Sequence, residues 1–231
     1  MNKDFFTQLS DFRTAACVCC HKRRKYHEFS MITSATVGVC KNCMEGIGQT
    51  RYGSSFEGSR YVSYILSPLE YNESAREMVK GLKFLRNTLI ADIFDEMFGE
   101  FLAYYDHLSE FDMVVSVPLS KERLMERGYN QADYISQIIS RHIDVPVLEP
   151  VARIKHTKRQ SGLSAQKRFY NVMDAFKSDD SVCGKRIILV DDVRTTGNTM
   201  DNCAKAMIEK GAIEVIGITA TITVPKFKIS Y

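Results

Sequence analysis

Apolar residues follow two different spacings along the chain, and each spacing predicts one kind of secondary structure. Short runs of mostly apolar residues are typical of strands that are buried on both faces. These runs lie at 112–117, 186–190 and 213–223. Apolar residues spaced by three or four positions are typical of amphipathic helices. They occupy 90–105, 135–143 and 200–208. The alternation of strands with helices predicts an α/β fold with a parallel sheet flanked by helices.

The segment before the first of these strands adds a strand, a helix and a domain boundary. We expect a strand over Tyr61–Leu66 and a helix over 75–83, from the spacing of the apolar residues in each. Residues 49–60 are rich in Gly and Ser, which indicates a linker. The sequence therefore predicts two domains, a small one at 1–58 and a larger one at 59–231.

Length and composition are those of one α/β domain with a small appendage. The chain has 231 residues, of which 45% are hydrophobic and 26% charged, as is common in globular proteins. No apolar run approaches the length of a membrane span, and Met1–Phe6 has no signal-peptide pattern. We therefore expect a cytoplasmic protein without membrane insertion, whose seven cysteines stay reduced.

Four of these cysteines form two C-x-x-C pairs near the N-terminus. Cys17 and Cys20 are separated from Cys40 and Cys43 by nineteen residues, which fits the spacing of a four-thiolate zinc site. A segment this small has few large apolar residues, so a metal would supply stability that its core lacks. We expect a structural zinc ion here; the alternative is a set of reduced cysteines without metal. Cys19 is a fifth thiol that the site does not need.

Basic residues are concentrated in two short segments, although the net charge of the whole chain is only +3. Lys22–Lys25 is a run of four cations, which fits either a nucleic-acid contact or a solvated turn. Residues 151–170 hold six Lys or Arg residues and no acid. This second segment predicts a flexible loop that acts as a lid over an anion, as a nucleic-acid contact, or as a solvated loop. Its candidate residues are Arg153, Lys155, Lys158, Arg159, Gln160 and Arg168.

Two carboxylates and a loop of small residues follow the strand at 186–190. Asp191 and Asp192 are good acceptors for sugar hydroxyls, and the next helix presents its unpaired N-terminal N–H groups to an anion. The loop residues are Thr195, Thr196, Gly197, Asn198 and Thr199. Glycine lets the backbone approach a phosphate closely, and threonine adds hydroxyl donors. Because ligands of open α/β sheets bind beyond the carboxyl ends of the strands, this segment predicts a site for a phosphorylated sugar. The alternative is an ordinary capped helix beside two solvated aspartates.

A second loop follows the strand at 112–117 and should lie at the same edge of the sheet. That position could bind pyrophosphate, with nearby cations neutralising its charge. The candidates are Val117, Pro118, Leu119, Arg123 and Arg127. An ordinary basic cluster on the surface explains the two arginines nearly as well. A nucleoside-triphosphate site is excluded, because the required G-x-x-x-x-G-K-[ST] loop is missing from the sequence.

The segment Val190–Thr199 resembles the phosphoribosyl-pyrophosphate (PRPP) motif of type I phosphoribosyltransferases. The resemblance implies that the two aspartates hold the ribose 2′- and 3′-hydroxyls. It also implies that the threonine-rich loop holds the 5′-phosphate and that Mg²⁺ accompanies PRPP.

Three features over most of the chain are similar to the ComF family of competence proteins. They are the four-cysteine finger, Val117–Leu119 followed by Arg127–Ala132, and the pattern of residues from Arg153 to Phe176. The resemblance implies a type I phosphoribosyltransferase domain joined to an N-terminal zinc finger. It further implies a cytoplasmic role with incoming single-stranded DNA, and with other competence proteins, during natural transformation, or a role in DNA use more broadly. One departure is Arg194, where the family usually carries an aromatic or apolar residue.

Three functions are compatible with these features. The first is an enzyme that transfers phosphoribose from PRPP to a nucleobase or related amine. Such an enzyme needs no general base, because catalysis rests on positioning and on neutralising the charge of the leaving pyrophosphate. The second is a DNA-binding competence factor that also binds PRPP, and the third is a PRPP-sensing regulator.

Overall fold

The computed structural model describes residues 13–34, 37–47, 59–82, 88–154 and 175–223. Its larger part is built on a five-stranded sheet in which every strand pair is parallel. The strand order is β5-β11-β10-β7, and β6 also pairs with β11. The strands are β5 (Ile65–Leu66), β6 (Leu69–Glu70), β7 (Met113–Ser116), β10 (Arg186–Arg194) and β11 (Glu214–Ile222). The predicted parallel α/β sheet is therefore confirmed.

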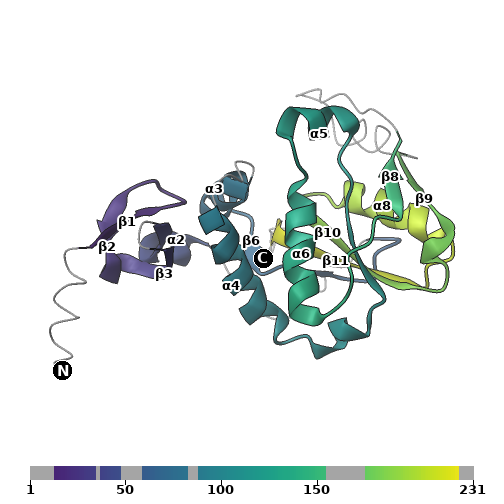
Figure 1. Cartoon of the computed structure of the whole chain (residues 1–231), viewed down its shortest axis with the longest axis horizontal. Helices are drawn as coiled ribbons and strands as arrows, with labels where there is room; N and C mark the ends of the chain where they lie inside the picture. Colours follow the sequence, from purple (N-terminus) through teal and green to yellow (C-terminus); the bar gives the residue numbers. More distant parts are fainter. Residues whose placement is uncertain (1–12, 35–36, 48–58, 83–87, 155–174, 224–231) are drawn as a thin grey trace, which may run out of the picture.

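Helices cover both faces of this sheet (Figure 1). Alternate residues of a strand point to opposite faces, so Ile188 joins the core on one face and Ile187 joins the core on the other. The first core also includes residues of α3 (Glu73–Leu82), α4 (Thr88–Leu102) and α6 (Gln131–Ile143). The second core includes residues of α8 (Asn198–Ile208). Because both faces are covered, the central strands consist almost entirely of apolar residues up to the point where Asp191 begins the polar segment.

Several short elements complete the larger part. An antiparallel pair, β8 (Val151–Arg153) with β9 (Phe176–Ser178), packs on α8. The helix α5 (Lys121–Arg127) follows β7. Two 3₁₀-helices span Asp106–Glu110 and Asp180–Val182. No helix in the described part of the chain has the length and apolar character that a bilayer crossing requires.

The N-terminal unit is a small four-stranded sheet with one helix. Its sheet has the order β2-β1-β4-β3. The elements are β1 (Thr14–Cys17), β2 (Arg23–Lys25), a 3₁₀-helix (Tyr26–Glu28), β3 (Phe29–Ser34), β4 (Val37–Cys40) and α2 (Lys41–Gly46). The unit lies beside α3 and α4 in Figure 1, and its apolar residues belong to the same core as Phe94 and Phe98 of α4. The Asn72 side chain joins the two parts, because its amide donates to the Gly46 carbonyl and its oxygen accepts from the Ala75 N–H of α3.

The structure corrects the sequence-based boundaries at several elements. The strand expected at 186–190 continues through both aspartates to Arg194, because its pairing with β11 extends to Arg194 and Ile222. The strand expected over Tyr61–Leu66 is reduced to β5, and the chain pairs with β11 again as β6 only after an interruption at Ser67 and Pro68. The predicted linker at 49–60 lies outside the described residues except for its last two positions, Ser59 and Arg60.

Two elements were not predicted from the sequence. The segment leading from Pro118 toward Arg127 was expected to be a loop, but it contains the helix α5. The Ser120 hydroxyl caps this helix by accepting from the Arg123 N–H, and Gly128 ends it with φ of +78°. The pair β8–β9 was also missed, since strands of three residues are too short to show a periodicity.

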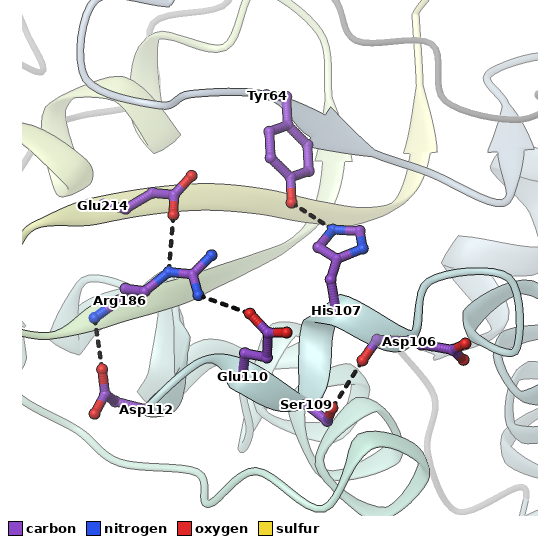
Figure 2. A network of polar contacts seen from close by, with 8 residues as sticks. All are labelled: Tyr64, Asp106, His107, Ser109, Glu110, Asp112, Arg186 and Glu214. Carbon is purple, nitrogen blue, oxygen red and sulfur yellow. Dashed lines mark hydrogen bonds and ion pairs between the residues drawn. The ribbon is translucent and has the colours of Figure 1, made fainter.

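A network of ion pairs lies at the amino ends of the central strands (Figure 2), whereas the two aspartates lie toward the carboxyl end of β10. The Arg186 guanidinium, at the start of β10, donates to Glu214 at 3.0 Å and to Glu110 at 3.3 Å. It also lies over the Phe111 ring, with 4.5 Å between the guanidinium carbon and the ring centroid. The backbone N–H of Arg186 donates to Asp112 at 2.8 Å. These contacts fix the amino end of the strand, and Asp191 and Asp192 lie toward its other end.

Candidate functional site

Asp191 and Asp192 lie in the last part of β10 and are both partly exposed. One carboxyl oxygen of Asp191 accepts the backbone N–H of Asp192 at 2.8 Å. Although Asp191 as a residue is partly exposed, its carboxyl group is largely shielded from water, and this shielding is the first reason that its pKa is raised well above the usual value; the neighbouring acid Asp192 is the second. A carboxyl group in this position gains from any ligand hydroxyl that donates to its charged form.

The loop after β10 and the first turn of α8 form a hollow beside Asp191. It is lined by Asp191, Val193, Arg194, Thr195, Thr196, Gly197, Asn198, Thr199 and Met200. Gly197 precedes α8 with φ of +78°, a conformation that favours glycine. A Cβ atom at this position would also lie 3.2 Å from the Nε of Arg194. The structure therefore brings Asp191 and the five loop candidates together at a helix N-terminus, where an anion is favoured. Asp192 is not part of the lining.

The candidate pyrophosphate loop lies next to this hollow. The Val117 N–H donates to the Val190 carbonyl at 2.8 Å, one residue before Asp191. Pro118 and Leu119 follow and are partly exposed. Of the two candidate arginines, both on α5, Arg127 donates to the Gln131 side-chain oxygen at 3.0 Å. The backbone loop thus lies at the same sheet edge as the acidic pair, as the sequence predicted.

Arg153 lies within electrostatic range of both Asp191 and the helix α5. It ends β8, is partly buried, and lies over the Phe176 ring at 5.3 Å from its centroid. Burial lowers the pKa of Arg153, and the nearby positive charge of Arg123 lowers it further, whereas the negative charge of Asp191 raises it. Arg153 therefore lies within electrostatic range of Arg123 on α5 and of Asp191 on β10. This arrangement is suited to a ligand with several negative charges.

The other candidates of the basic loop lie outside the described residues. They are Lys155, Lys158, Arg159, Gln160 and Arg168. Arg153, which was predicted in the same loop, belongs instead to the ordered pair β8–β9.

The four predicted cysteines come together in the N-terminal unit. Cys17 ends β1, Cys40 ends β4, and Cys43 lies in α2. Their sulfur atoms and that of Cys20 all lie within 4.8 Å of one another, with 4.0 Å between those of Cys20 and Cys40. Tetrahedral zinc with sulfur ligands at 2.3 Å requires sulfur atoms about 3.8 Å apart, so the cluster fits such an ion.

The fifth thiol, Cys19, lies beside this cluster. It is buried, and its hydrogen bond to the Cys17 sulfur is the main reason that the pKa of Cys17 is lowered to about 3. The backbone N–H of Cys40 also donates to that sulfur at 3.5 Å. Both donors stabilise the thiolate form, which is the form that binds metal.

Sequence reasoning missed three residues at the sheet edge. Arg194 was noted only as an unusual residue, yet it lines the hollow beside Gly197. Gln131 and Thr219 are buried, and each has a side-chain polar atom without a hydrogen-bond partner in the described residues. Thr219 is paired in register with Asp191. A threonine in a largely apolar strand gives no signal in the sequence, since its importance depends on which strand lies beside it.

Comparison with known proteins identifies relatives along much of the chain. A family model described as the phosphoribosyl transferase domain matches residues 131–226. Competence protein F of Haemophilus influenzae is 42% identical over 108 residues, which cover 45% of this chain and 47% of that protein. DNA utilization protein YhgH of Escherichia coli is 39% identical over 105 residues, which cover 45% of this chain and 46% of that protein. The chain therefore matches less than half the length of these two relatives.

A longer match and a solved structure complete the comparison. Competence protein ComFC of Bacillus subtilis is 30% identical over 173 residues, which cover 75% of this chain and 67% of that protein. Among solved structures, the glutamine PRPP amidotransferase of Bacillus subtilis is similar with a TM-score of 0.42 and 19% identity. This match covers 62% of this chain and 30% of that one.

Proposed function

The chain belongs to the ComF family of competence proteins, and we propose that it binds PRPP and acts in DNA uptake and natural transformation, where it contacts single-stranded DNA. The observation that carries this proposal is the hollow in which Asp191, the threonine-rich loop and the N-terminus of α8 meet. An anion site and a pair of hydroxyl acceptors, joined in this way, match the two ends of a phosphorylated ribose.

Each part of PRPP has a counterpart among the residues of the site. The N-terminal N–H groups of α8 and the hydroxyls of Thr195, Thr196 and Thr199 would donate to the 5′-phosphate, and Gly197 would let the phosphate approach the backbone. Asp191 and Asp192 would accept from the ribose 2′- and 3′-hydroxyls. The backbone of 117–119 and the cations of Arg123, Arg127 and Arg153 would hold the pyrophosphate. Mg²⁺, bound together with PRPP, would supply further neutralisation of that charge.

Transfer of phosphoribose is the second candidate function. Charge on the departing pyrophosphate would be stabilised by Arg153, which lies within electrostatic range of Asp191, and by Arg123 beside it, and this stabilisation is the main requirement for the reaction. The experiment is to incubate the protein with PRPP, Mg²⁺ and candidate bases or amines, and to follow both PRPP binding and pyrophosphate release. Binding with release would establish the enzyme, binding alone would favour a PRPP-dependent competence factor or sensor, and no binding would overturn the proposal.

The cysteine cluster has a structural role in this proposal. We infer that it holds one zinc ion, because all four positions of a tetrahedral ion would be filled by thiolates and none would be open to a substrate.

The exposed cations of Lys22, Arg23 and Lys25 lie in the same unit and are available to DNA phosphates. Other competence proteins would be further partners, and the cytoplasm is the compartment in which this function would take place.

Replacing Arg123 with glutamine should weaken PRPP binding by about tenfold, which corresponds to one charge-assisted hydrogen bond. Binding of ribose 5-phosphate should be unchanged, because that ligand lacks the pyrophosphate. Titration calorimetry with both ligands provides the measurement. Lys177→Gln, which removes an exposed cation from β9, is the matched control and should change neither affinity. Equal loss of both ligands in the Arg123 variant would contradict the assignment of this residue to pyrophosphate.

Reversing the charge of Lys158 and Arg159, both to glutamate, should weaken binding of single-stranded DNA. If each cation contacts one phosphate, the slope of log affinity against log salt concentration should become shallower by about 1.4. Fluorescence anisotropy with a labelled oligonucleotide, repeated over a range of salt concentrations, measures both quantities. An unchanged salt slope would exclude these two residues from the DNA contact.

A further inference from the structure

Thr219 is a buried polar residue without a hydrogen-bond partner, and it lies next to the candidate PRPP site. Its side chain is 0% exposed, and its hydroxyl forms no hydrogen bond with any described residue. Nearly all buried polar groups in folded proteins are hydrogen-bonded, and an exception often indicates a partner that arrives only in another state of the protein. Burial also means that bulk water does not reach this hydroxyl. The group therefore requires an explanation.

The pairing of strands places Asp191 next to this hydroxyl. Thr219 and Asp191 are partners in the parallel ladder between β11 and β10, so their side chains leave the sheet on the same face. Neighbouring strands are about 4.8 Å apart, which is within reach of a short side chain. The Thr219 hydroxyl has three staggered positions about its first side-chain torsion, and rotation among them changes the direction in which it donates.

We propose that Thr219 is a positioning residue, whose hydroxyl donates to the Asp191 carboxylate when PRPP is bound. This inference rests on the proposed function of the site. In the free protein one carboxyl oxygen of Asp191 is occupied by the Asp192 N–H. The Thr219 hydroxyl, on the neighbouring strand β11, would donate a second hydrogen bond to the Asp191 carboxylate. The carboxylate would then be fixed in one orientation toward the ribose hydroxyls.

The surroundings of Asp191 explain why this hydrogen bond should depend on the ligand. Burial and Asp192 raise its pKa, Arg153 opposes them, and the thiol of Cys203 lies near the same carboxyl group. In the free protein, burial and Asp192 make the charged form of Asp191 less favourable than in an exposed carboxyl group, and this reduces the gain from a donor. Ribose hydroxyls favour the charged form, and a hydroxyl that donates to a carboxylate then makes a charge-assisted bond.

The test uses two replacements of Thr219 that separate the effect on stability from the effect on binding. Thr219→Val keeps the shape of the side chain and removes the buried hydroxyl, so the melting temperature of the free protein should rise by about 2–4 °C. Its dissociation constant for PRPP with Mg²⁺ should increase by about tenfold or more. Thr219→Ser keeps the hydroxyl and loses a buried methyl group, so its melting temperature should fall. Its affinity for PRPP should stay within about threefold of the unmodified protein, a difference of less than 1 kcal/mol.

Thr221→Val is the matched control. Thr221 is also fully buried in β11 and also has no hydrogen-bond partner in the described residues, but its partner in β10 is Val193. This variant should gain stability and bind PRPP normally. Normal binding by Thr219→Val, or equal weakening by Thr219→Val and Thr221→Val, would overturn the inference and leave the proposed function in place. If the unmodified protein does not bind PRPP, both the proposed function and the inference fail.

Discussion

Replacing both Asp191 and Asp192 with asparagine should weaken PRPP binding by about a hundredfold or more. Each aspartate is proposed to accept a ribose hydroxyl, and each charge-assisted hydrogen bond is worth about 1.5–3 kcal/mol, or roughly tenfold or more in affinity. Asparagine has nearly the same shape as aspartate, and both side chains are partly exposed, so the fold should be retained. Titration calorimetry measures the affinity, and thermal unfolding checks the fold.

The same variant separates PRPP binding from DNA binding. It removes negative charge, so affinity for single-stranded DNA should be unchanged or slightly higher. Asp92→Asn with Glu96→Gln removes the same charge from exposed positions of α4 and should leave PRPP binding intact. If the aspartate variant binds DNA but no longer supports transformation, the PRPP site is required for that role. Normal transformation by this variant would contradict a PRPP-dependent competence function and favour a DNA-binding platform.

Replacing Cys40 with serine should abolish zinc binding and unfold the N-terminal unit. Structural zinc contributes about 10–16 kcal/mol of apparent binding free energy in isolated fingers, which exceeds what a core of this size can replace. The larger domain should stay folded, because α6 and α8 pack directly on its sheet. Its melting temperature should nevertheless fall, since the N-terminal unit shares the core of α4 and the hydrogen bond from Asn72 to Gly46 would be lost.

Elemental analysis and limited proteolysis measure these effects. We expect one zinc ion per chain in the unmodified protein and none in the Cys40 variant, with rapid cleavage confined to the N-terminal unit. Cys183→Ser changes an exposed cysteine outside the cluster and should keep both zinc and protease resistance. Gently purified protein that contains no zinc would refute the assignment. A Cys40 variant without any folded domain would show that the two parts depend on each other completely.

The sequence predicts best those elements whose buried apolar residues form a continuous run or recur at a regular spacing. The apolar run of β10 and the helical spacing of α8 and α6 locate these elements within a few residues, because each faces one continuous core. The short helix α5 has no buried residue, so it leaves no apolar pattern. Its ends are set instead by Ser120 and Gly128, and these signals are weaker than a periodic core face.

The candidate site could be predicted only where it is contiguous in the sequence. The segment from Asp191 to Thr199 lies on one strand, one loop and one helix end. The relative placement of its residues therefore follows from local structure, which the sequence motif predicts. The electrostatic proximity of Arg153, Arg123 and Asp191 joins three separate elements. The pairing of Thr219 with Asp191 depends on the register between two strands. Neither can be read from one sequence, because both depend on tertiary placement.

The strand order has a consequence for the way the chain folds as it is synthesised. β11, the last strand of the described chain, lies between β5 and β10, so β5 has no partner in the sheet until β11 has left the ribosome. Until then the strand that carries Asp191 and Asp192 has an open edge on that side. The N-terminal unit, whose strands pair only with one another, can assemble and take up a metal much earlier. During translation, therefore, the finger can form first, whereas the candidate PRPP site is among the last features to be completed.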